Sequence, residues 1–403
     1  MSGTGIIAAT RNVVHETSCV QRSVENLLEN LVPSLPSLIR QGDRVLIKVN
    51  MGCSGLRSPE DRVTTHPVLL EAIIRALYDC GARVSFGDDV ARVGKHVEEL
   101  WRRTGMFEVA RRTGATLVDF VAAGAQEVRG SLLYPRKYLV TNAYFDADVV
   151  INCANCRSHP NIILSGAIKN MFGLVVGKRK ALMHELFWDE PYKFSRAIAD
   201  IYRTIPADLS FLDLTSVREG QGTNGDIAKI RNVGLILAST DPVALDTVAA
   251  HAIGYERLPI WTTYHAHKFG LGEKEIAKIL IQGLDWNGFE KQHLEFPLLE
   301  AKSNKTVYDR LSNFANHTFL RPRPVISPAK CTGCGDCARR CPVKAVEPVG
   351  GNVFRINPTK CADCGCCLKV CERSAVSLNH LGMARMVRGL MTSADVGDIK
   401  RQS

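Results

Sequence analysis

Short apolar runs alternate with amphipathic segments along the first three quarters of the chain. Residues Leu69, Leu70, Ile73, Ile74 and Leu77 recur at helical spacing, which predicts a helix that buries one face. This helix is expected to begin at 64–67, where a threonine hydroxyl caps it and a proline occupies its first turn, and to stop at 81. A second helix is expected after the Asp-Pro pair at 241–242. The apolar runs that we predict to be buried strands are 45–47, 84–86, 117–119, 149–151, 209–213 and 234–238.

Continuous apolar strands that alternate with helices are typical of a parallel sheet covered on both faces. The sequence therefore predicts an α/β fold with a mostly parallel sheet and helices on both faces, over residues 1–320.

Polar residues recur at or just after the carboxyl ends of these predicted strands. They are Lys48, Asn50, Asp88, the stretch 152–159 and Asp241. Each of them alone is more often a cap or loop residue than a functional one. Because ligands of open parallel sheets bind outside this edge, the group as a whole favours a site there.

Length and composition restrict the class of protein. A chain of 403 residues exceeds one ordinary domain, and 45% hydrophobic with 23% charged residues is usual for a globular protein. No apolar run approaches the roughly 18 to 20 residues that cross a bilayer, and the N-terminus has no signal-peptide pattern, so we expect a cytoplasmic protein without membrane contact. Its basic residues are scattered, without interleaved aromatic residues, which argues against nucleic-acid binding.

Nine of the 14 cysteines lie in a repeat near the C-terminus. Each copy has the spacing C-x2-C-x2-C-x3-C, and the two copies are offset by thirty residues. This spacing is that of bacterial ferredoxins with two [4Fe–4S] clusters, in which the fourth cysteine of each run serves the other cluster. A pair of zinc knuckles is the alternative, but zinc does not require the third and fourth cysteines at these intervals. The expected ligand sets are Cys331, Cys334, Cys337 and Cys371 for one cluster and Cys361, Cys364, Cys367 and Cys341 for the other.

This repeat completes the predicted domain organisation and corrects the charge. A small α+β ferredoxin-like domain is expected at 325–378, followed by a C-terminal helix or tail at 379–403. Cys366 takes the place of Asp336 of the first run and is expected to be a spectator. Two clusters with their thiolates lower the formal charge from +10 to about +6. The remaining excess favours an acidic redox partner or an anionic substrate, or is simply that of a mildly basic protein.

Six stretches between about residues 40 and 280 carry a resemblance to a known family: Ile47–Asn50, Thr64–Pro67, Phe86–Asp88, Arg157–His159, Gly166–Gly173 and Ala238–Asp246. They resemble the family of unknown function numbered 362, whose members are often joined to a two-cluster ferredoxin. The resemblance implies a redox-associated role without a settled reaction. In one departure, Cys153-Ala154-Asn155-Cys156 stands where family members tend to have a proline and a lysine.

Several of these polar residues are candidates for chemistry. His159 is the first acid–base candidate, because histidine titrates near neutral pH, and Lys169 is the second. Lys169 and Arg157 would neutralise an anionic substrate or a developing oxyanion. The alternative for Lys169 and His159 is a purely structural role. The expected substrate-binding residues are Lys48, Asn50, His66, Asp88, Arg157 and Asn170, of which Asn50 and His66 are the weaker candidates.

Three further cysteines follow predicted strands at the same edge. Cys53, Cys153 and Cys156 would hold a third iron–sulfur cluster, or a Cys3His zinc ion together with His159. A redox-active dithiol in 153–156 is another hypothesis, and small buried cysteines that behave as apolar residues are the plain alternative.

The preferred functional hypothesis is an iron–sulfur reductase. An external donor, such as a ferredoxin, a flavodoxin or a reductase, would reduce the clusters, which pass single electrons to an unsaturated or carboxylated small molecule at the strand edge. The competing hypothesis is an electron carrier or partner-docking protein without chemistry of its own. Glycine-rich stretches such as 220–222 lack a dinucleotide fingerprint, so we predict no nicotinamide site. The oligomeric state is not predicted.

Overall fold

The computed structural model divides the chain into two compact units, Met1–Glu300 and Ala301–Ser403. It describes residues 5–12, 14–51, 58–89, 97–132, 136–177, 180, 183, 187, 190–220, 229–297, 323–350, 353–361 and 365–379, and the side chains of 323, 369, 378 and 379 are also outside the description.

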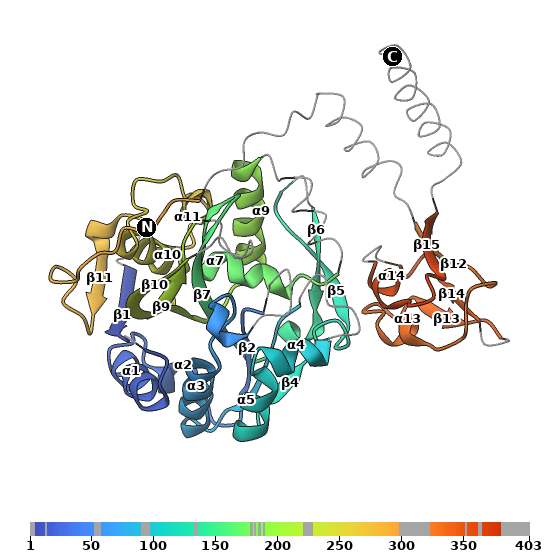
Figure 1. Ribbon diagram of the computed structural model, residues 1–403, viewed down its shortest axis with the longest axis horizontal. Helices are drawn as coiled ribbons and strands as arrows, with labels where there is room; N and C mark the ends of the chain where they lie inside the picture. Colours follow the sequence, from blue (N-terminus) through green and yellow to red (C-terminus); the bar gives the residue numbers. More distant parts are fainter. Residues whose placement is uncertain are drawn as a thin grey trace, which may run out of the picture. The chain divides into compact units, whose positions relative to one another are not determined.

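A nine-stranded sheet forms the centre of the large unit (Figure 1). Its strand order is β11-β1-β10-β9-β7-β2-β3-β4, and β8 pairs with β7. The pairs from β9 to β4 are all parallel, as is β1 with β11, whereas β10 runs antiparallel to β1 and β9. The predicted α/β class with a mostly parallel sheet is confirmed. The strands are β1 (Gly5–Arg11), β2 (Arg44–Lys48), β3 (Arg83–Gly87), β4 (Thr116–Val118), β7 (Val149–His159), β8 (Ile163–Ser165), β9 (Leu209–Arg218), β10 (Ile230–Ser239) and β11 (Ile279–Gln282).

Helices cover both faces of this sheet. One apolar core joins the sheet to α1, α3 and α5, and a second core on the other face joins it to α7 and α10. A two-stranded ribbon, β5 (Ala125–Arg129) with β6 (Lys137–Thr141), lies outside the main sheet. The helices are α1 (Thr17–Glu29), α2 (Leu35–Leu38), α3 (Pro67–Asp79), α4 (Val97–Arg103), α5 (Met106–Thr113), α6 (Asn142–Phe145), α7 (Ala167–Asn170), α9 (Pro191–Thr204), α10 (Pro242–Ala252) and α11 (Trp261–Lys268), with 3-10 turns η1 (Pro59–Asp61), η3 (Met171–Leu174) and η5 (Ile276–Lys278).

The helix expected after residue 64 is α3, and its five periodic apolar residues are buried. Its cap differs from the prediction. The Nδ1 atom of His66 accepts a hydrogen bond from the backbone N–H of Val68, and the Thr65 hydroxyl instead donates to the carbonyl of Cys153. The first turn of α3 is therefore tied to the neighbouring strand by the residue that was expected to cap it.

Strand β7 is much longer than the predicted run at 149–151, since it continues to His159 with every residue buried. Its early part pairs with β2 through Asn152, and β8 pairs with it again from Arg157 onward. Among the described strands, none pairs with residues 153–156 on this edge. The fold therefore leaves a break in strand pairing beside β7, directly beyond the carboxyl end of β2, and residues 63–65 lie along it; this break is called the gap below.

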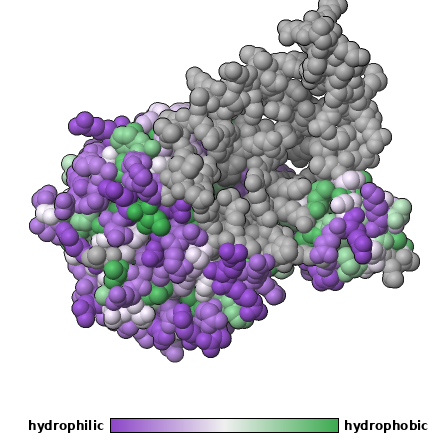
Figure 2. Space-filling model, in the orientation of Figure 1, coloured by the Kyte–Doolittle hydropathy of each residue, from purple (hydrophilic) through white to green (hydrophobic). Residues whose placement is uncertain are grey.

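The small unit consists of two equivalent halves. Strand β12 (Arg323–Ile326) pairs with β15 (Val376–Asn379), and β13 (Val346–Pro348) pairs with β14 (Phe354–Ile356). The short helices α13 (Asp336–Arg339) and α14 (Cys366–Val370) pack around a core that includes Cys337 and Cys367. Val325 and Val349 are among its exposed apolar side chains, whereas the face of the large unit in Figure 2 is mostly hydrophilic. The helix or tail expected at 379–403 lies almost wholly outside the described residues.

Candidate functional site

The strand order reverses at the gap beyond β2. From β2 the chain proceeds to β3 and β4 on one side, and it then returns to β7 and β9 on the other side of β2. Ligands of open α/β sheets bind outside the carboxyl ends of the strands at such a switch point. The predicted site edge therefore coincides with a gap that the topology itself creates.

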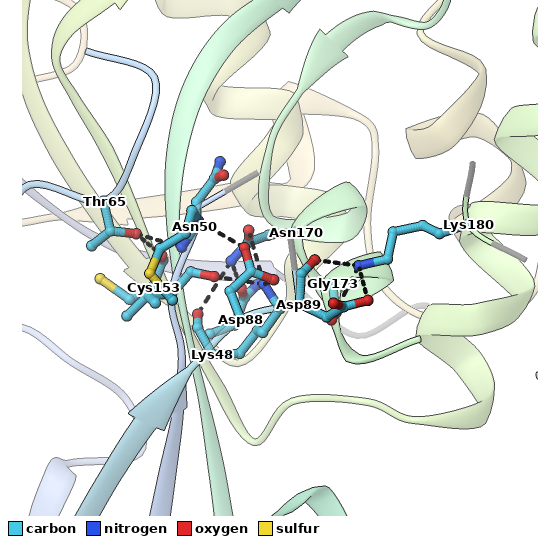
Figure 3. Close-up of polar contacts among 12 residues, drawn as sticks. Lys48, Asn50, Thr65, Asp88, Asp89, Cys153, Asn170, Gly173 and Lys180 are labelled. Atoms are coloured by element: carbon cyan, nitrogen blue, oxygen red, sulfur yellow. Dashed lines mark hydrogen bonds and ion pairs between the residues drawn. The ribbon is translucent and has the colours of Figure 1, made fainter. Parts of the chain in front are cut away.

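Lys48 and Asp88 form a buried ion pair at the carboxyl ends of β2 and β3 (Figure 3). The Lys48 Nζ and Asp88 Oδ1 atoms are 2.9 Å apart, and their side chains are 1% and 3% exposed. Burial lowers the pKa of Lys48, and the carboxylate of Asp88 opposes that effect. Asp88 also accepts a 2.7 Å hydrogen bond from the backbone N–H of Met51. The pair is locally neutral and holds the ends of β2 and β3 together.

Asn170 at the end of α7 is anchored to the strands beneath it. Its side-chain amide donates to the Lys48 carbonyl at 3.2 Å and to the Asn152 side-chain oxygen at 2.7 Å. Asn152 in turn donates to the Ala167 carbonyl at 2.9 Å. These hydrogen bonds fix α7 against β2 and β7, so the Asn170 side chain has a structural role at the site.

Gly173 allows this close approach of the chain. A Cβ atom there would overlap the Lys48 ammonium and the Asp88 carboxylate, so only glycine fits. Beside it, Lys180 lies 3.3 Å from Asp89 and donates a hydrogen bond to the Asp89 carbonyl. Two lysine–aspartate pairs therefore line this side of the gap.

Asn50 forms the other wall together with Thr65. The Asn50 N–H donates to the Thr65 hydroxyl at 2.7 Å, and the Thr65 N–H donates to the Asn50 carbonyl at 2.8 Å. The Thr65 hydroxyl in turn donates a hydrogen bond to the Cys153 carbonyl at 2.6 Å. The chain around Asn50 is thus locked to β7 beside the gap.

Lys169 differs from the other lysines of the site. Its ammonium makes no hydrogen bond or ion pair with any residue that the structure describes, although the side chain is only partly exposed. Burial, together with the positive charges of Arg157, Lys180 and Lys48, lowers the pKa of Lys169 to about 7, and the carboxylate of Asp88 opposes that effect. Lys169 therefore combines an available cationic group with a proton that is easily released at neutral pH.

Arg157 and His159 lie further along β7. The Arg157 guanidinium is buried and donates to the Val63 carbonyl at 2.9 Å. The His159 Nδ1 atom accepts from the backbone N–H groups of Asn161 and Ile162, at 3.2 and 3.4 Å. His159 thus stabilises the turn from β7 into β8, and its contacts favour the structural alternative over the acid–base role.

The extension of β7 separates the two cysteines that were expected to act together. Side chains alternate between the faces of a strand, and Cys153 packs in the core with α3 while Cys156 packs in the core with α10. Both are fully buried, and burial raises the pKa of each thiol. The interpretation of 153–156 as a loop carrying a dithiol or a shared metal centre is therefore corrected. Cys53 lies outside the described residues.

His66 belongs to a cluster that sequence reasoning missed. Its ring stacks on that of His15, with centroids 3.9 Å apart, and the His15 Nε2 atom lies 2.8 Å from the Asp213 carboxylate. Burial would raise the pKa of Asp213, but the hydrogen bonds from His15 and Thr215 outweigh it and lower that pKa. Burial lowers the pKa of His66 to about 3, so this imidazole is neutral. Only the spatial arrangement brings these residues together, because 198 positions separate His15 from Asp213.

The small unit fits the expected clusters in its described residues. Gly335 and Gly365 take left-handed φ angles of 75° and 67° at equivalent places before α13 and α14. The Cys341 and Cys371 sulfurs accept hydrogen bonds from backbone N–H groups, at 3.1 and 3.2 Å, again at equivalent places. Hydrogen bonds to sulfur are typical of thiolates that ligate iron–sulfur clusters. Cys364 alone among the eight expected ligands lies outside the described residues.

Two family models match the chain. Residues 45–251 match the domain of unknown function DUF362, which is more than half of the chain. The chain belongs to this family. Residues 323–372 of this DUF362 protein match a 4Fe-4S dicluster domain, which confirms the predicted fusion and an iron–sulfur, electron-transfer module.

Relatives of this DUF362 protein extend the comparison. It is 30% identical over 267 residues to the thylakoid-associated protein sll1697 of Synechocystis sp., which covers 66% of the chain and 79% of that protein. The lactate racemase apoprotein of Thermoanaerobacterium thermosaccharolyticum matches with 16% identity and a TM-score of 0.38, over 60% of this chain and 55% of that one. A Thermotoga maritima protein matches with 14% identity and a TM-score of 0.37, over 64% and 60%. The chain thus spans little more than half of either solved structure. Within its described part, the DUF362 protein has no helix long and apolar enough to cross a membrane.

Proposed function

We propose that this DUF362 protein is an iron–sulfur oxidoreductase. In this proposal, two [4Fe–4S] clusters in the small unit deliver single electrons to a small anionic molecule bound at the carboxyl end of β2. The first cluster is assigned to Cys331, Cys334, Cys337 and Cys371, and the second to Cys361, Cys364, Cys367 and Cys341.

The observation that carries the proposal is that the Lys169 ammonium has no ion-pair partner among the residues that the structure describes. This ammonium lies at the switch point of the sheet, near the positive charges of Arg157, Lys180 and Lys48. Such a concentration of positive charge favours an anionic ligand. The neighbouring lysines do not compete for that ligand to the same degree, since Lys48 and Lys180 already face Asp88 and Asp89. A carboxylate group of the substrate is the chemistry that best fits this position.

The remaining residues of the gap position the substrate in this proposal. Asn50 and Asn170 fix the chain on either side of the gap by hydrogen bonds. Lys48 and Asp88 form an ion pair without net charge, which does not repel an anion. When bound, the clusters supply electrons one at a time. Lys169 binds the anion and releases a proton as negative charge builds up, because its lowered pKa of about 7 allows proton loss at neutral pH.

The electrons come from outside the chain. A reduced ferredoxin, a flavodoxin or a reductase is the proposed donor, and the excess of basic residues favours an acidic partner. The thylakoid association in the name of one relative supports a setting where such one-electron carriers are present. Two electrons, delivered one at a time by the donor, and two protons complete the reduction of one double bond.

An anaerobic reoxidation assay tests the proposal. Protein is reduced with one equivalent of dithionite per cluster, and the return of cluster absorbance is followed after addition of fumarate, crotonate or 2-oxoglutarate, each in excess. The proposal expects at least one compound to reoxidise the protein without any partner protein. Reoxidation that requires an added carrier protein with every compound would instead establish the electron-carrier hypothesis.

A further inference from the structure

The cluster around His15 lies along the same gap. The Thr65 hydroxyl bonds to the Cys153 carbonyl and Arg157 bonds to the Val63 carbonyl, so residues 63–65 follow the unpaired stretch of β7. Asp213 is the register partner of Asn155 in that stretch. The pair of His15 and Asp213 therefore lies on the opposite face of β7 from Cys156 and next to the proposed substrate gap.

Three buried polar atoms in this cluster have no hydrogen-bond partner among the residues that the structure describes. They are the His15 Nδ1, the Thr64 hydroxyl oxygen and the Asn155 side-chain oxygen. A buried polar atom without a partner costs about 1–3 kcal/mol, and most such atoms in proteins are satisfied by ligands, water or protein. Three of them in one cluster indicate a place for a small polar group from outside the chain.

The chemistry of these atoms restricts that group. An amide oxygen only accepts hydrogen bonds, so the group next to Asn155 carries a hydrogen. Asp213 is ionised and accepts the Nε2–H of His15, which leaves the His15 Nδ1 atom free to take or give a proton. His66 accepts the Val68 N–H at Nδ1, so its neutral ring carries a hydrogen on Nε2 and offers a further donor. A hydroxyl group fits all of these atoms.

We infer that His15, oriented by Asp213, transfers a proton to and from a substrate oxygen next to Thr64 and Asn155. The Thr64 hydroxyl donates to the oxo form of the substrate, and the Asn155 side-chain oxygen accepts from the hydroxyl form. This inference rests on the proposed function and specifies its substrate class as a small oxo compound with an anionic group, which is reduced to the hydroxyl compound. The carbonyl takes two electrons from the external one-electron donor through the iron–sulfur domain. Its carbon gains a proton from solvent, and its oxygen gains the Nδ1 proton of His15 as that N–H bond breaks. A second solvent proton then restores His15.

The first arm of the test uses the intact, oxidised protein and needs no turnover. Histidine side chains labelled with 15N report which ring nitrogen carries hydrogen. We expect hydrogen on Nε2 of His15 in the wild type and loss of that preference in Asp213→Asn, whereas Asp208→Asn, directly before β9, leaves it unchanged. Addition of 2-oxoglutarate should shift the Nδ1 signal of His15. Hydrogen on Nδ1 of neutral His15, or a signal that 2-oxoglutarate leaves in place, overturns the inference.

The second arm measures the rate of reoxidation by 2-oxoglutarate. His15→Gln keeps an N–H that can reach Asp213 but cannot transfer a proton, so the fold is preserved. We expect it to slow reoxidation by 2-oxoglutarate by about 100-fold or more at unchanged half-saturation, whereas His251→Gln, on α10, changes the rate less than twofold. An unchanged rate in His15→Gln contradicts the inference but leaves the proposed function intact. If no compound reoxidises even the wild type, the proposed function is wrong. The 15N signal of His15 then decides alone whether this residue contacts a ligand.

Discussion

The carboxylate of Asp246 accepts a 2.6 Å hydrogen bond from the backbone N–H of Ala167, at the start of α7. Its second oxygen accepts the N–H of Ile168 at 3.2 Å. Gly166 makes this possible, because a Cβ atom there would overlap the carboxylate. The short helix that carries Lys169 and Asn170 is therefore held from α10, on the face of the sheet away from α3.

The first prediction follows from the protonation of Asp246. Burial raises the pKa of Asp246 to about 7, from an ordinary value of 3.8. Between these values the folded chain holds a proton that the unfolded chain has lost, so the free energy of unfolding falls as pH rises from about 4 to about 7. The slope from this group is at most about 1.4 kcal/mol per pH unit.

Asp246→Asn should remove that slope. Urea unfolding followed by tryptophan fluorescence is the appropriate measurement, because all four tryptophans lie in the large unit. Asp208→Asn is the control and should keep the wild-type slope. The same pH dependence in Asp246→Asn and in the wild type would show that the carboxyl is not protonated in this range.

A second prediction concerns the buried pair of Lys48 and Asp88. Removal of one partner leaves an uncompensated charge in the interior, so Lys48→Met and Asp88→Asn should each lower the free energy of unfolding by about 3–5 kcal/mol. The double variant Lys48→Met/Asp88→Asn should recover part of that loss. Asp148→Asn, which breaks an exposed pair with Arg44, should have a much smaller effect. Additive losses in the double variant would contradict a coupled pair.

The third prediction separates cluster ligands from spectator cysteines in the small unit. Cys341→Ser should lower the iron content of anaerobically purified protein from about eight to about four per chain, since one cluster loses a ligand. Cys366→Ser replaces a buried cysteine of the same unit and should keep about eight irons. Equal iron loss in both variants would refute the assignment of Cys366 as a spectator.

The fourth prediction addresses Cys153. Because its thiol packs in an apolar core, Cys153→Ser should leave the iron content unchanged and lower the free energy of unfolding by about 1–3 kcal/mol. Cys19→Ser changes an exposed cysteine and should affect neither quantity. A loss of iron in Cys153→Ser would restore a third metal centre at the strand edge.

Much of the fold follows from the spacing of apolar residues. The runs at 45–47, 84–86, 149–151 and 209–213 all lie in strands of the sheet, and the periodic residues of α3 are buried as expected. Lys48, Asn50, Asp88 and Asn170 meet at one edge because parallel strands end together. The position of the gap could therefore be predicted from strand ends alone.

The length of β7 could not be predicted in the same way. Asn152, Asn155 and Arg157 are polar residues inside a fully buried strand, and a pattern of apolar positions assigns them to a loop. That error placed Cys153 and Cys156 together, whereas alternation along the strand separates them. His15 and Asp213 gave no local signal, because their pairing depends on which strands become neighbours.

The measurement that most directly tests the site is the concentration dependence of anaerobic reoxidation in Lys169→Ala. Loss of a charge-assisted contact to the substrate is expected to raise the half-saturating concentration of the oxidising compound by about 10-fold or more. Lys193→Ala, which removes an exposed lysine of α9, should stay within twofold of the wild type. If Lys169→Ala has the same maximal rate and the same half-saturating concentration as the wild type, the substrate binds elsewhere and the proposed site is contradicted.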